Sequence, residues 1–310
     1  MVAIINPSAG GGKALQKWNR SELSLREYLG SMTTRVVEGR ADVMELVARM
    51  ISEGETRFIA AGGDGTVNLL LESIMEYASP DVRPNVKLGA VGIGSSNDFQ
   101  KPSSQGEKID GIPCRINFDS TVLRDVGVLV YEDDEGDLHR RYWIVNASVG
   151  VTAEANLFFN RYIRVMNCLK QSVTNAAILY AALHTLATYR NREMTIHLED
   201  EQSIQTCVTN LGVVKSPHFS GNFCYDSPFE HDSGRFYVHL CENMPMLTTL
   251  LTLRALSRRK FSGLPLTRSW RSRWLTVRSD QPFAVEFDGE VTTTRCASFS
   301  VIQKGLQVCT

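Results

Sequence analysis

The sequence has few of the features that mark secreted, membrane-spanning or nucleic-acid-binding proteins. Its seven cysteines are scattered, odd in number and contain no C-x-x-C pair, which argues against a disulfide framework and a zinc site. The apolar run 176–189 is too short to span a bilayer, and the N-terminal residues lack the pattern of a signal peptide. The net charge is only −1 and no nucleic-acid-binding motif is present. We therefore expect a cytoplasmic protein that does not bind nucleic acid.

The chain is long enough for two domains. It has 310 residues, of which 43% are hydrophobic, so it can supply a sizeable core. Up to residue 125, β-rich and helix-periodic segments alternate, which predicts an α/β domain with a mostly parallel sheet and helices on both faces. From residue 126 onward, short β-rich runs predict an antiparallel β-sandwich or barrel with a helical insert. The predicted domains are thus 1–125 and 126–310.

The expected elements follow the change of hydrophobic period along the chain. In the first domain we expect strands near 2–7, 33–39, 57–63 and 86–94, and helices near 15–30, 41–54 and 66–78. In the second we expect a hairpin near 123–151, helices within 155–190, and strands near 193–200, 205–214, 234–242, 273–279, 283–290 and 297–310.

Three loops of small residues follow strands of the first domain. They read "NPSAGGGK" (6–13), "GGDGT" (62–66) and "GIGSSNDF" (92–99). In an open parallel sheet such loops meet at the carboxyl ends of the strands, where bare backbone N–H groups and helix N-termini bind anions. The first loop is neither a Walker A motif nor a G-x-G-x-x-G motif. We expect Lys13, Asp64 and Asp98 to converge on a polyphosphate and its magnesium ion.

Five motifs together resemble one family. In this order, "NPSAGGGK", "GGDGTVN", "GSSNDF", "RDVG" (124–127) and "FDGE" (287–290) are similar to the diacylglycerol kinase catalytic-domain family, which includes bacterial lipid kinases, sphingosine kinases and ceramide kinases. The resemblance covers nearly the whole chain. "GGDGT" alone is shared with NAD kinases and phosphofructokinases, so the ordered set and the late "DGE" carry the specificity.

The resemblance implies an ATP site between an α/β nucleotide-binding domain and a β-sandwich domain. It implies that Asp64 holds Mg²⁺ or helps to activate the acceptor hydroxyl, and that Asp98 and Asp125 join it in an aspartate–water–magnesium network. Asp288 or Glu290 would act as general base. The residues that would bind the nucleotide are Asn6, Pro7, Ser8, Gly10, Gly12, Lys13, Gly62, Gly63, Gly65, Thr66, Asn68, Ser95, Ser96 and Asn97.

The chain departs from the family pattern at three positions. Leu69 follows "GGDGTVN" where family members usually carry Glu, and Thr152 stands where the family often has Asp. Ser233 replaces an acidic residue in a loop that holds a structural magnesium ion in bacterial relatives. A site for that structural ion is therefore not expected here.

A basic and aromatic segment occupies 254–278. No acidic residue lies between Glu242 and Asp280, while this stretch contains seven arginines, one lysine and two tryptophans. Anionic headgroups attract Lys and Arg, and Trp favours the membrane interface, so the segment predicts peripheral contact with a membrane. The other interpretation is a solvated helix end whose arginines favour the helix C-terminus and whose tryptophans belong to the core.

These features predict an ATP- and Mg²⁺-dependent lipid kinase that phosphorylates a hydroxyl of a diacylglycerol- or sphingoid-like lipid. A kinase of a soluble acceptor, similar to NAD kinases, is one alternative. A non-catalytic lipid- or nucleotide-binding regulator of the same fold is another. A lipid substrate and a membrane surface are the expected partners, and a homodimer stays open.

Overall fold

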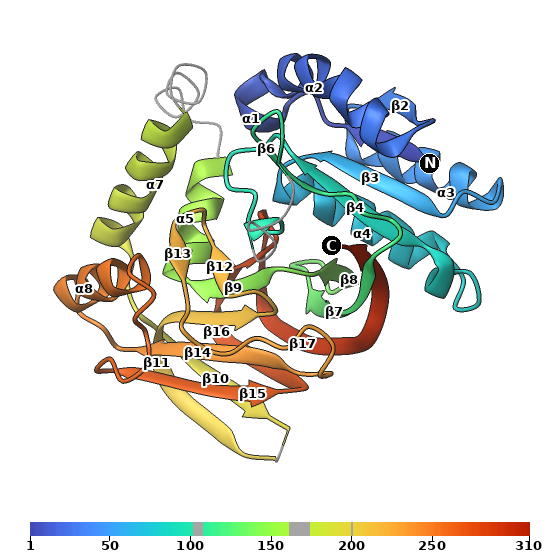
Figure 1. The fold of residues 1–310 in the computed structure, drawn as a ribbon. Helices are drawn as coiled ribbons and strands as arrows, with labels where there is room; N and C mark the ends of the chain where they lie inside the picture. Colours follow the sequence, from blue (N-terminus) through green and yellow to red (C-terminus); the bar gives the residue numbers. More distant parts are fainter. Residues whose placement is uncertain (102–107, 161–173, 200) are drawn as a thin grey trace. The chain divides into compact units, whose positions relative to one another are not determined.

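The computed structural model describes residues 1–101, 108–160, 174–199 and 201–310 (Figure 1). The chain forms two compact units, each of which is described by itself. The first comprises Met1–Val126, His218–Gly221 and Gln303–Thr310, and the second comprises Gly127–Pro217 and Asn222–Ile302. The predicted boundary between residues 125 and 126 assigns both returning segments, 218–221 and 303–310, to the second domain, whereas they pack with the first unit.

The first unit is built on a parallel sheet, as its alternating pattern predicts. β1 pairs in parallel with β2 and β3, β3 pairs in parallel with β4, and β4 pairs antiparallel with β6. The elements are β1 (Val2–Ile5), α1 (Ala9–Gly12), α2 (Ala14–Leu29), β2 (Thr33–Val36), α3 (Arg40–Ser52), β3 (Arg57–Gly62), α4 (Asp64–Tyr77), η1 (Arg83–Asn85), β4 (Lys87–Gly92), β5 (Lys108–Ile109), β6 (Ile112–Arg115) and β12 (His218–Phe219).

The central strands of this sheet are apolar on both faces because helices cover both. β1 is buried along its whole length, and so are the last five residues of β3 and of β4. Figure 1 shows α2 on one face of the sheet and α3 and α4 on the other. On the α2 face, Trp18 and Leu25 pack into a core that includes Ile5 and Ile59. In such a sheet, ligands usually bind at the loops that follow the carboxyl ends of the strands.

The C-terminal segment of the chain completes the first unit. Residues Gln307 and Val308 pair in parallel with Lys87 and Leu88 of β4, so the last residues extend the parallel sheet. The Gln307 side chain accepts a hydrogen bond from Thr121 Oγ1 at 2.7 Å. These contacts hold the first residues of β4 on its edge opposite to β3.

The second unit is dominated by antiparallel strands. β9 pairs with β11 and β16, and β11 also pairs with β10 and β14. β14 pairs with β15, β16 with β10 and β17, and β7 with β8. The strands are β7 (Thr121–Glu132), β8 (Leu138–Trp143), β9 (Asn146–Gly150), β10 (Arg192–Leu198), β11 (Ser203–Val214), β13 (Phe223–Cys224), β14 (Phe236–Glu242), β15 (Thr267–Ser272), β16 (Trp274–Phe287) and β17 (Glu290–Cys309). β7 begins in the first unit and β17 ends there.

The mixed α/β class and the antiparallel pairing agree with the sequence analysis. A core of the second unit gathers inward-facing residues of these strands, among them Trp143, Phe236 and Phe299. The predicted hairpin is formed by β7 and β8 around the acidic turn. In that turn, the Asp133 carboxylate accepts backbone N–H groups of Glu135 and Asp137, both at 2.9 Å. The packing of two sheets as a sandwich stays a prediction.

The described helices of the second unit are α5 (Val151–Asn160), α7 (Thr174–Thr188) and α8 (Met246–Leu256). The predicted helical insert at 155–190 corresponds to α5 and α7, and its residues 161–173 lie outside the described part. Among the helices that the structure describes, none combines the length and apolar character needed to cross a bilayer.

Candidate functional site

The loop after β1 makes a left-handed turn. Gly10, Gly11 and Gly12 have φ values of 60°, 70° and 80°, a region that side chains with a Cβ atom rarely adopt. The turn ends at the exposed Lys13, directly before α2. A Cβ atom at Gly10 would stand 2.6 Å from the carbonyl oxygen of Ile93, which lies in the loop after β4. The first and third loops therefore meet at bare backbone.

The second and third loops touch still more closely. A Cβ atom at Gly94 would stand 2.3 Å from the Cα atom of Gly63 and 2.8 Å from its nitrogen. The Gly94 N–H also donates to the carbonyl oxygen of Gly62 at 3.0 Å. We call residues 6–13, 62–66 and 92–99 the three-loop site. Its glycines allow three strand ends to converge with no side chain between them.

Asp64 connects two of these loops. It opens α4, directly after β3, and its side chain is partly exposed. Its carboxylate accepts the backbone N–H of Asp98 at 3.1 Å and that of Phe99 at 2.9 Å. A carboxylate in the first turn of a helix is also favoured by the helix dipole. Asp64 therefore fixes the third loop against the N-terminus of α4.

Asp98 is a buried anchor, with 4% of its surface exposed. Its carboxylate pairs with the ammonium group of Lys101 and accepts the backbone N–H of Gly221 at 3.0 Å. Lys101 also donates to the Gly221 carbonyl oxygen. The segment 218–221, which returns to the first unit from far along the chain, is thus tied to the third loop. The spacing of Asp98 and Lys101 is a signal in the sequence for this pair.

Asp125 is likewise buried, and its carboxylate accepts the backbone N–H of Lys304 at 2.9 Å. Across residues 1–101, 108–160, 174–199 and 201–310, no three His, Cys, Asp or Glu side chains gather closely enough to hold a metal ion. Asp64, Asp98 and Asp125 instead bind backbone N–H groups, and Asp98 also binds Lys101. These carboxylates hold loop backbone, and the predicted aspartate–water–magnesium network through them stays a prediction.

Several residues predicted to bind nucleotide also shape the loops. Thr66 is buried, and a Cβ atom at Gly62 would stand 2.1 Å from its hydroxyl oxygen. Asn68 is fully buried in α4. The Asn97 side chain bonds to its own loop, accepting from Gly94 N at 3.1 Å and donating to the Gly92 carbonyl oxygen at 3.0 Å. These contacts give Thr66, Asn68 and Asn97 a part in shaping the loops, and their contact with a nucleotide stays a prediction.

The remaining predicted ligands are accessible to different degrees. Ser8, Gly12, Lys13 and Ser95 are exposed, while Asn6, Pro7, Gly10, Gly63, Gly65 and Ser96 are half-buried. The Asn6 side chain accepts the backbone N–H of Ser8 at 3.0 Å, which shapes the start of the first loop. Sequence reasoning missed Lys17, whose Nζ donates to the Ile93 carbonyl oxygen at 3.3 Å and so joins α2 to the third loop.

Two buried arginines hold the end of the third loop. The guanidinium groups of Arg115 and Arg124 lie 5.3 and 5.6 Å from the centre of the Phe99 ring. Burial lowers the pKa of Arg115 to about 10, so it is still protonated at neutral pH. Cations over an aromatic face stabilise the ring position. They also place positive charge beside a loop that we expect to meet phosphate groups.

The "FDGE" residues lie in the second unit and differ from each other. Asp288 is buried, and its carboxylate accepts backbone N–H groups of Ile144 at 2.7 Å, Val145 at 3.0 Å and Asn146 at 2.9 Å. It therefore holds the bend between β8 and β9. Glu290 is exposed at the start of β17. The geometry supports a structural role for Asp288, and the identity of the general base stays a prediction.

This difference gives a test of the two acids. We expect Asp288→Asn to lower the free energy of unfolding by about 1–3 kcal/mol, because the amide turns an N–H donor toward buried N–H donors. Glu290→Gln, at an exposed position, should stay within about 0.5 kcal/mol of the parent chain. Denaturant unfolding measures both. Equal stability of the two variants would show that Asp288 does not hold the bend.

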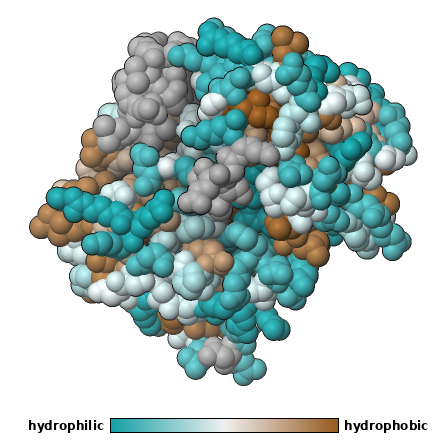
Figure 2. Space-filling view, viewed as in Figure 1, coloured by the Kyte–Doolittle hydropathy of each residue, from teal (hydrophilic) through white to brown (hydrophobic). Residues whose placement is uncertain are grey.

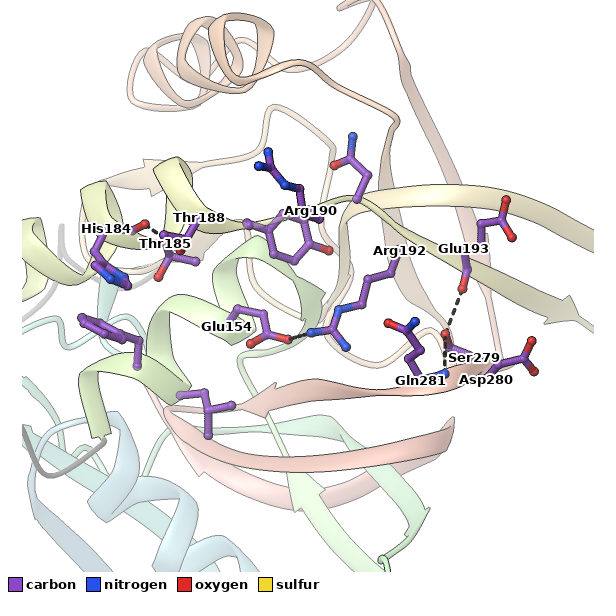
Figure 3. A pocket seen from close by; sticks show the side chains of 14 residues that line it. Glu154, His184, Thr185, Thr188, Arg190, Arg192, Glu193, Ser279, Asp280 and Gln281 are labelled. Carbon is purple, nitrogen blue, oxygen red and sulfur yellow. Dashed lines mark hydrogen bonds and ion pairs between the residues drawn. The ribbon is translucent and has the colours of Figure 1, made fainter.

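The second unit has a cavity of about 590 Å³ between α5, α7, the start of β10 and the middle of β16 (Figure 3). An ion pair between Glu154 and Arg192, at 3.0 Å, crosses it, and His184 stacks on Phe158 with ring centres 4.0 Å apart. None of the residues predicted to bind ATP or to act in catalysis lines it. Its charged walls do not resemble the glycine-rich three-loop site.

Comparison with known proteins agrees with the motifs. Residues 1–124 match the family model described as the diacylglycerol kinase catalytic domain. This part of the chain is similar to the catalytic domain of the diacylglycerol kinase family. The family resemblance seen in the sequence is thereby confirmed, and the matched residues contain all three loops.

Proteins that are similar to this chain have names that agree with the matched family model. A Streptococcus pneumoniae protein named "Putative lipid kinase" is 32% identical over 126 residues, which is 41% of this chain and 41% of that protein. A Staphylococcus haemolyticus protein named "Diacylglycerol kinase" is 25% identical over 99% of this chain and 87% of its own length. A crystal structure of a diacylglycerol kinase from Bacillus anthracis covers 99% of this chain and 95% of that one, with a TM-score of 0.69 at 14% identity. At that identity the last comparison shows the fold alone.

Proposed function

We propose that this chain is a lipid kinase that transfers the γ-phosphoryl group of ATP to a hydroxyl of a diacylglycerol- or sphingoid-like lipid. The observation that carries the proposal is the convergence of three glycine-rich strand ends in the three-loop site, where Gly94 meets Gly63 and Gly10 meets Ile93. Such close approaches gather the backbone N–H groups of three strand ends at one edge of the sheet, which is the usual construction of a phosphate site. A cytoplasmic location, with access to ATP, belongs to the same proposal.

The chemistry assigned to the chain is mainly positioning. Phosphoryl transfer requires that the donor phosphates be held and their developing charge be stabilised. The N-terminus of α4 and the backbone of the first loop supply N–H groups, Lys13 supplies a mobile charge, and Asp64 holds the third loop in register. We propose that Mg²⁺ is required as the partner of the ATP phosphates.

The lipid acceptor rests on the names of the relatives and on the ordered motifs. One relative is named as a lipid kinase and another as a diacylglycerol kinase, and the second aligns with nearly the whole chain. We extend that acceptor class to this chain. Contact with the membrane surface is the corresponding requirement, because such lipids reside in a bilayer.

Lys13 offers a test of ATP binding. It is exposed at the end of the left-handed turn, so it can reach a ligand but fixes no loop. Lys13→Ala should raise the KM for ATP about 10-fold and change kcat by less than about 3-fold, as expected for a group that binds ground state and transition state alike. Steady-state kinetics with varied ATP measures both constants, with Lys108→Ala, also exposed, as the control. A fall in kcat at unchanged KM would assign Lys13 to the transition state.

The function itself is tested with γ-labelled ATP and a total lipid extract in mixed micelles. The expected result is label in a phospholipid product whose formation requires Mg²⁺ and is lost in an Asp64→Asn variant. Label in a water-soluble product such as a phosphorylated dinucleotide would support the alternative, a kinase of a soluble acceptor. ATP binding without transfer to any acceptor would support a non-catalytic regulator.

A further inference from the structure

Helix α8 turns four large apolar side chains outward, while Leu256 at its end is buried. Met246, Leu247, Leu250 and Leu251 are 56%, 68%, 38% and 56% exposed. On the opposite side of the same helix, Thr249 and Thr252 are buried. A surface helix in water normally shows the reverse arrangement, with apolar residues toward the core and polar residues outward.

The hydroxyl groups of both buried threonines have partners within the protein. Thr249 Oγ1 donates to the Pro245 carbonyl oxygen at 3.3 Å, and Thr252 Oγ1 contacts the Met244 sulfur at 3.7 Å. The helix is therefore fixed in this orientation by its inner face. Four large apolar side chains gathered on the outer face of one short helix form a patch of the kind that meets another apolar phase.

Cations border this apolar face. Arg254 is exposed on α8, and Arg258, Arg259 and Lys260 are exposed in the turn that follows it. None of these four forms an ion pair with another described residue. Figure 2 shows the apolar surface of α8 at the left edge of the molecule with hydrophilic side chains directly beside it. An apolar face with a basic border is the pattern of helices that lie in the interface of an anionic membrane.

The remaining arginines of the predicted segment 254–278 are less available. Arg268 pairs with Glu242, and Arg271 pairs with Glu230 at 2.6 Å, both from β15. The Trp270 side chain packs against the core of the second unit. Within the predicted segment, the available cations therefore lie in residues 254–260, beside the apolar residues 246–251 of α8.

The turn after α8 is held in place. Phe261 is buried, with its ring 4.9 Å from that of Tyr225 in an edge-on contact. The Asp226 carboxylate accepts the backbone N–H groups of Phe261 at 3.2 Å and of Ser262 at 3.1 Å. The basic cluster thus stands between two fixed points, α8 and Phe261. A surface fixed in this way loses little conformational entropy on binding.

We propose that residues 246–260 form a docking surface for an anionic lipid bilayer, in which Met246, Leu247, Leu250 and Leu251 enter the headgroup region while Arg254, Arg258, Arg259 and Lys260 bind anionic headgroups. The absence of acidic residues from 243–279 favours this occupant over a second copy of the chain, whose identical basic face would repel it. The inference rests on the proposed function, which needs a route to lipid.

Sedimentation with vesicles tests the surface without any catalytic step. Changing Arg258, Arg259 and Lys260 to Gln should weaken binding to phosphatidylserine–phosphatidylcholine vesicles about 100-fold at low salt, because each cation near an anionic surface contributes about 1 kcal/mol. The loss should shrink at high salt, because exposed charges are screened. Changing Leu247 and Leu251 to Gln should weaken binding at least about 10-fold at both salt concentrations.

Matched controls remove the same groups elsewhere. A triple change of Arg20, Arg35 and Arg49 to Gln lowers the net charge equally, and a double change of Leu23 and Leu138 to Gln removes two exposed leucines. Both control variants should bind vesicles like the parent chain. As a second readout, Leu247→Trp should add fluorescence that lipids brominated on their acyl chains quench, compared with the parent chain and its four tryptophans.

Parent-like binding of the triple Arg258, Arg259 and Lys260 variant, or no added quenching in Leu247→Trp, would overturn the proposal. So would a change in oligomeric state of the Leu247 and Leu251 variant in the absence of vesicles, which would assign the face to a second copy. The sedimentation assay contains no ATP and therefore measures docking alone. A chain that docks on vesicles but phosphorylates no lipid would contradict only the proposed kinase function. Phosphorylation with parent-like docking of both variants would contradict only this surface.

Discussion

An Asp64→Asn variant is expected to phosphorylate lipid at least about 100-fold more slowly than the parent chain, which is the usual cost of removing one charge-handling group in group transfer. The physical reason lies in the two backbone N–H groups that the carboxylate accepts, at 3.1 Å from Asp98 and 2.9 Å from Phe99. An asparagine keeps one acceptor oxygen but presents its NH₂ group to the other N–H. The third loop then loses its register with α4.

The matched control is Asp42→Asn, which changes the carboxylate in the first turn of α3, outside the three-loop site. It should retain parent-like turnover, whereas Asp64→Asn should also lose about 1–3 kcal/mol of unfolding free energy through the unpaired N–H. Turnover and denaturant unfolding measured on both variants separate the two effects. Near-normal turnover of Asp64→Asn would remove Asp64 from the site.

A Gly94→Ala variant is expected to lose ATP binding, again by about 100-fold or more. The added methyl group would stand 2.3 Å from the Cα atom of Gly63, so the second and third loops must separate by roughly 1 Å or more, a misplacement that costs about 100-fold in a positioned site. Equilibrium binding of ATP, measured by calorimetry, reports the loss directly. The backbone at Gly94 lies outside the left-handed region, so the effect is steric.

Two further glycines calibrate this prediction. At Gly63 the added Cβ atom would stand 3.3 Å from the Cα atom of Gly94, so Gly63→Ala should have a smaller effect on ATP binding. At Gly89, in β4 and outside the loops, it would stand 2.9 Å from the Arg115 carbonyl oxygen. Gly89→Ala should lower stability by about 1–3 kcal/mol through overpacking but leave ATP affinity unchanged below its melting temperature. Equal losses of affinity in all three variants would indicate general unfolding.

The parts of the molecule that the sequence predicted well depend on local patterns. Strand–helix alternation determined the parallel sheet, and glycine-rich loops directly after buried strands determined the three-loop site, because parallel strands place such loops at one edge. The hairpin of β7 and β8 followed from two β-rich runs around an acidic turn. Residues that are close together in the sequence are sufficient to specify these features.

The features that were not predicted depend on contacts between distant residues. No local pattern indicates that Gly221 would bind Asp98, or that Lys304 would bind Asp125, across more than a hundred positions. Asp288 or Glu290 was predicted as the base, and the sequence did not indicate that the Asp288 carboxylate also accepts three backbone N–H groups of residues 144–146. In α8, periodicity alone does not show which face is turned inward. The choice of Thr249 and Thr252 for the inner face comes from packing.

Hydrogen–deuterium exchange on ATP binding tests the central claim most directly. If the three-loop site holds the phosphates, added Mg²⁺–ATP should slow backbone exchange in residues 6–13, 62–66 and 92–99, because their N–H groups become donors to phosphate. The cavity residues around Glu154 and Arg192 should show no change, and the Gly94→Ala variant should show no protection in the loops. Protection confined to the second unit, or ATP binding that leaves all three loops unprotected, would contradict the assignment of this site.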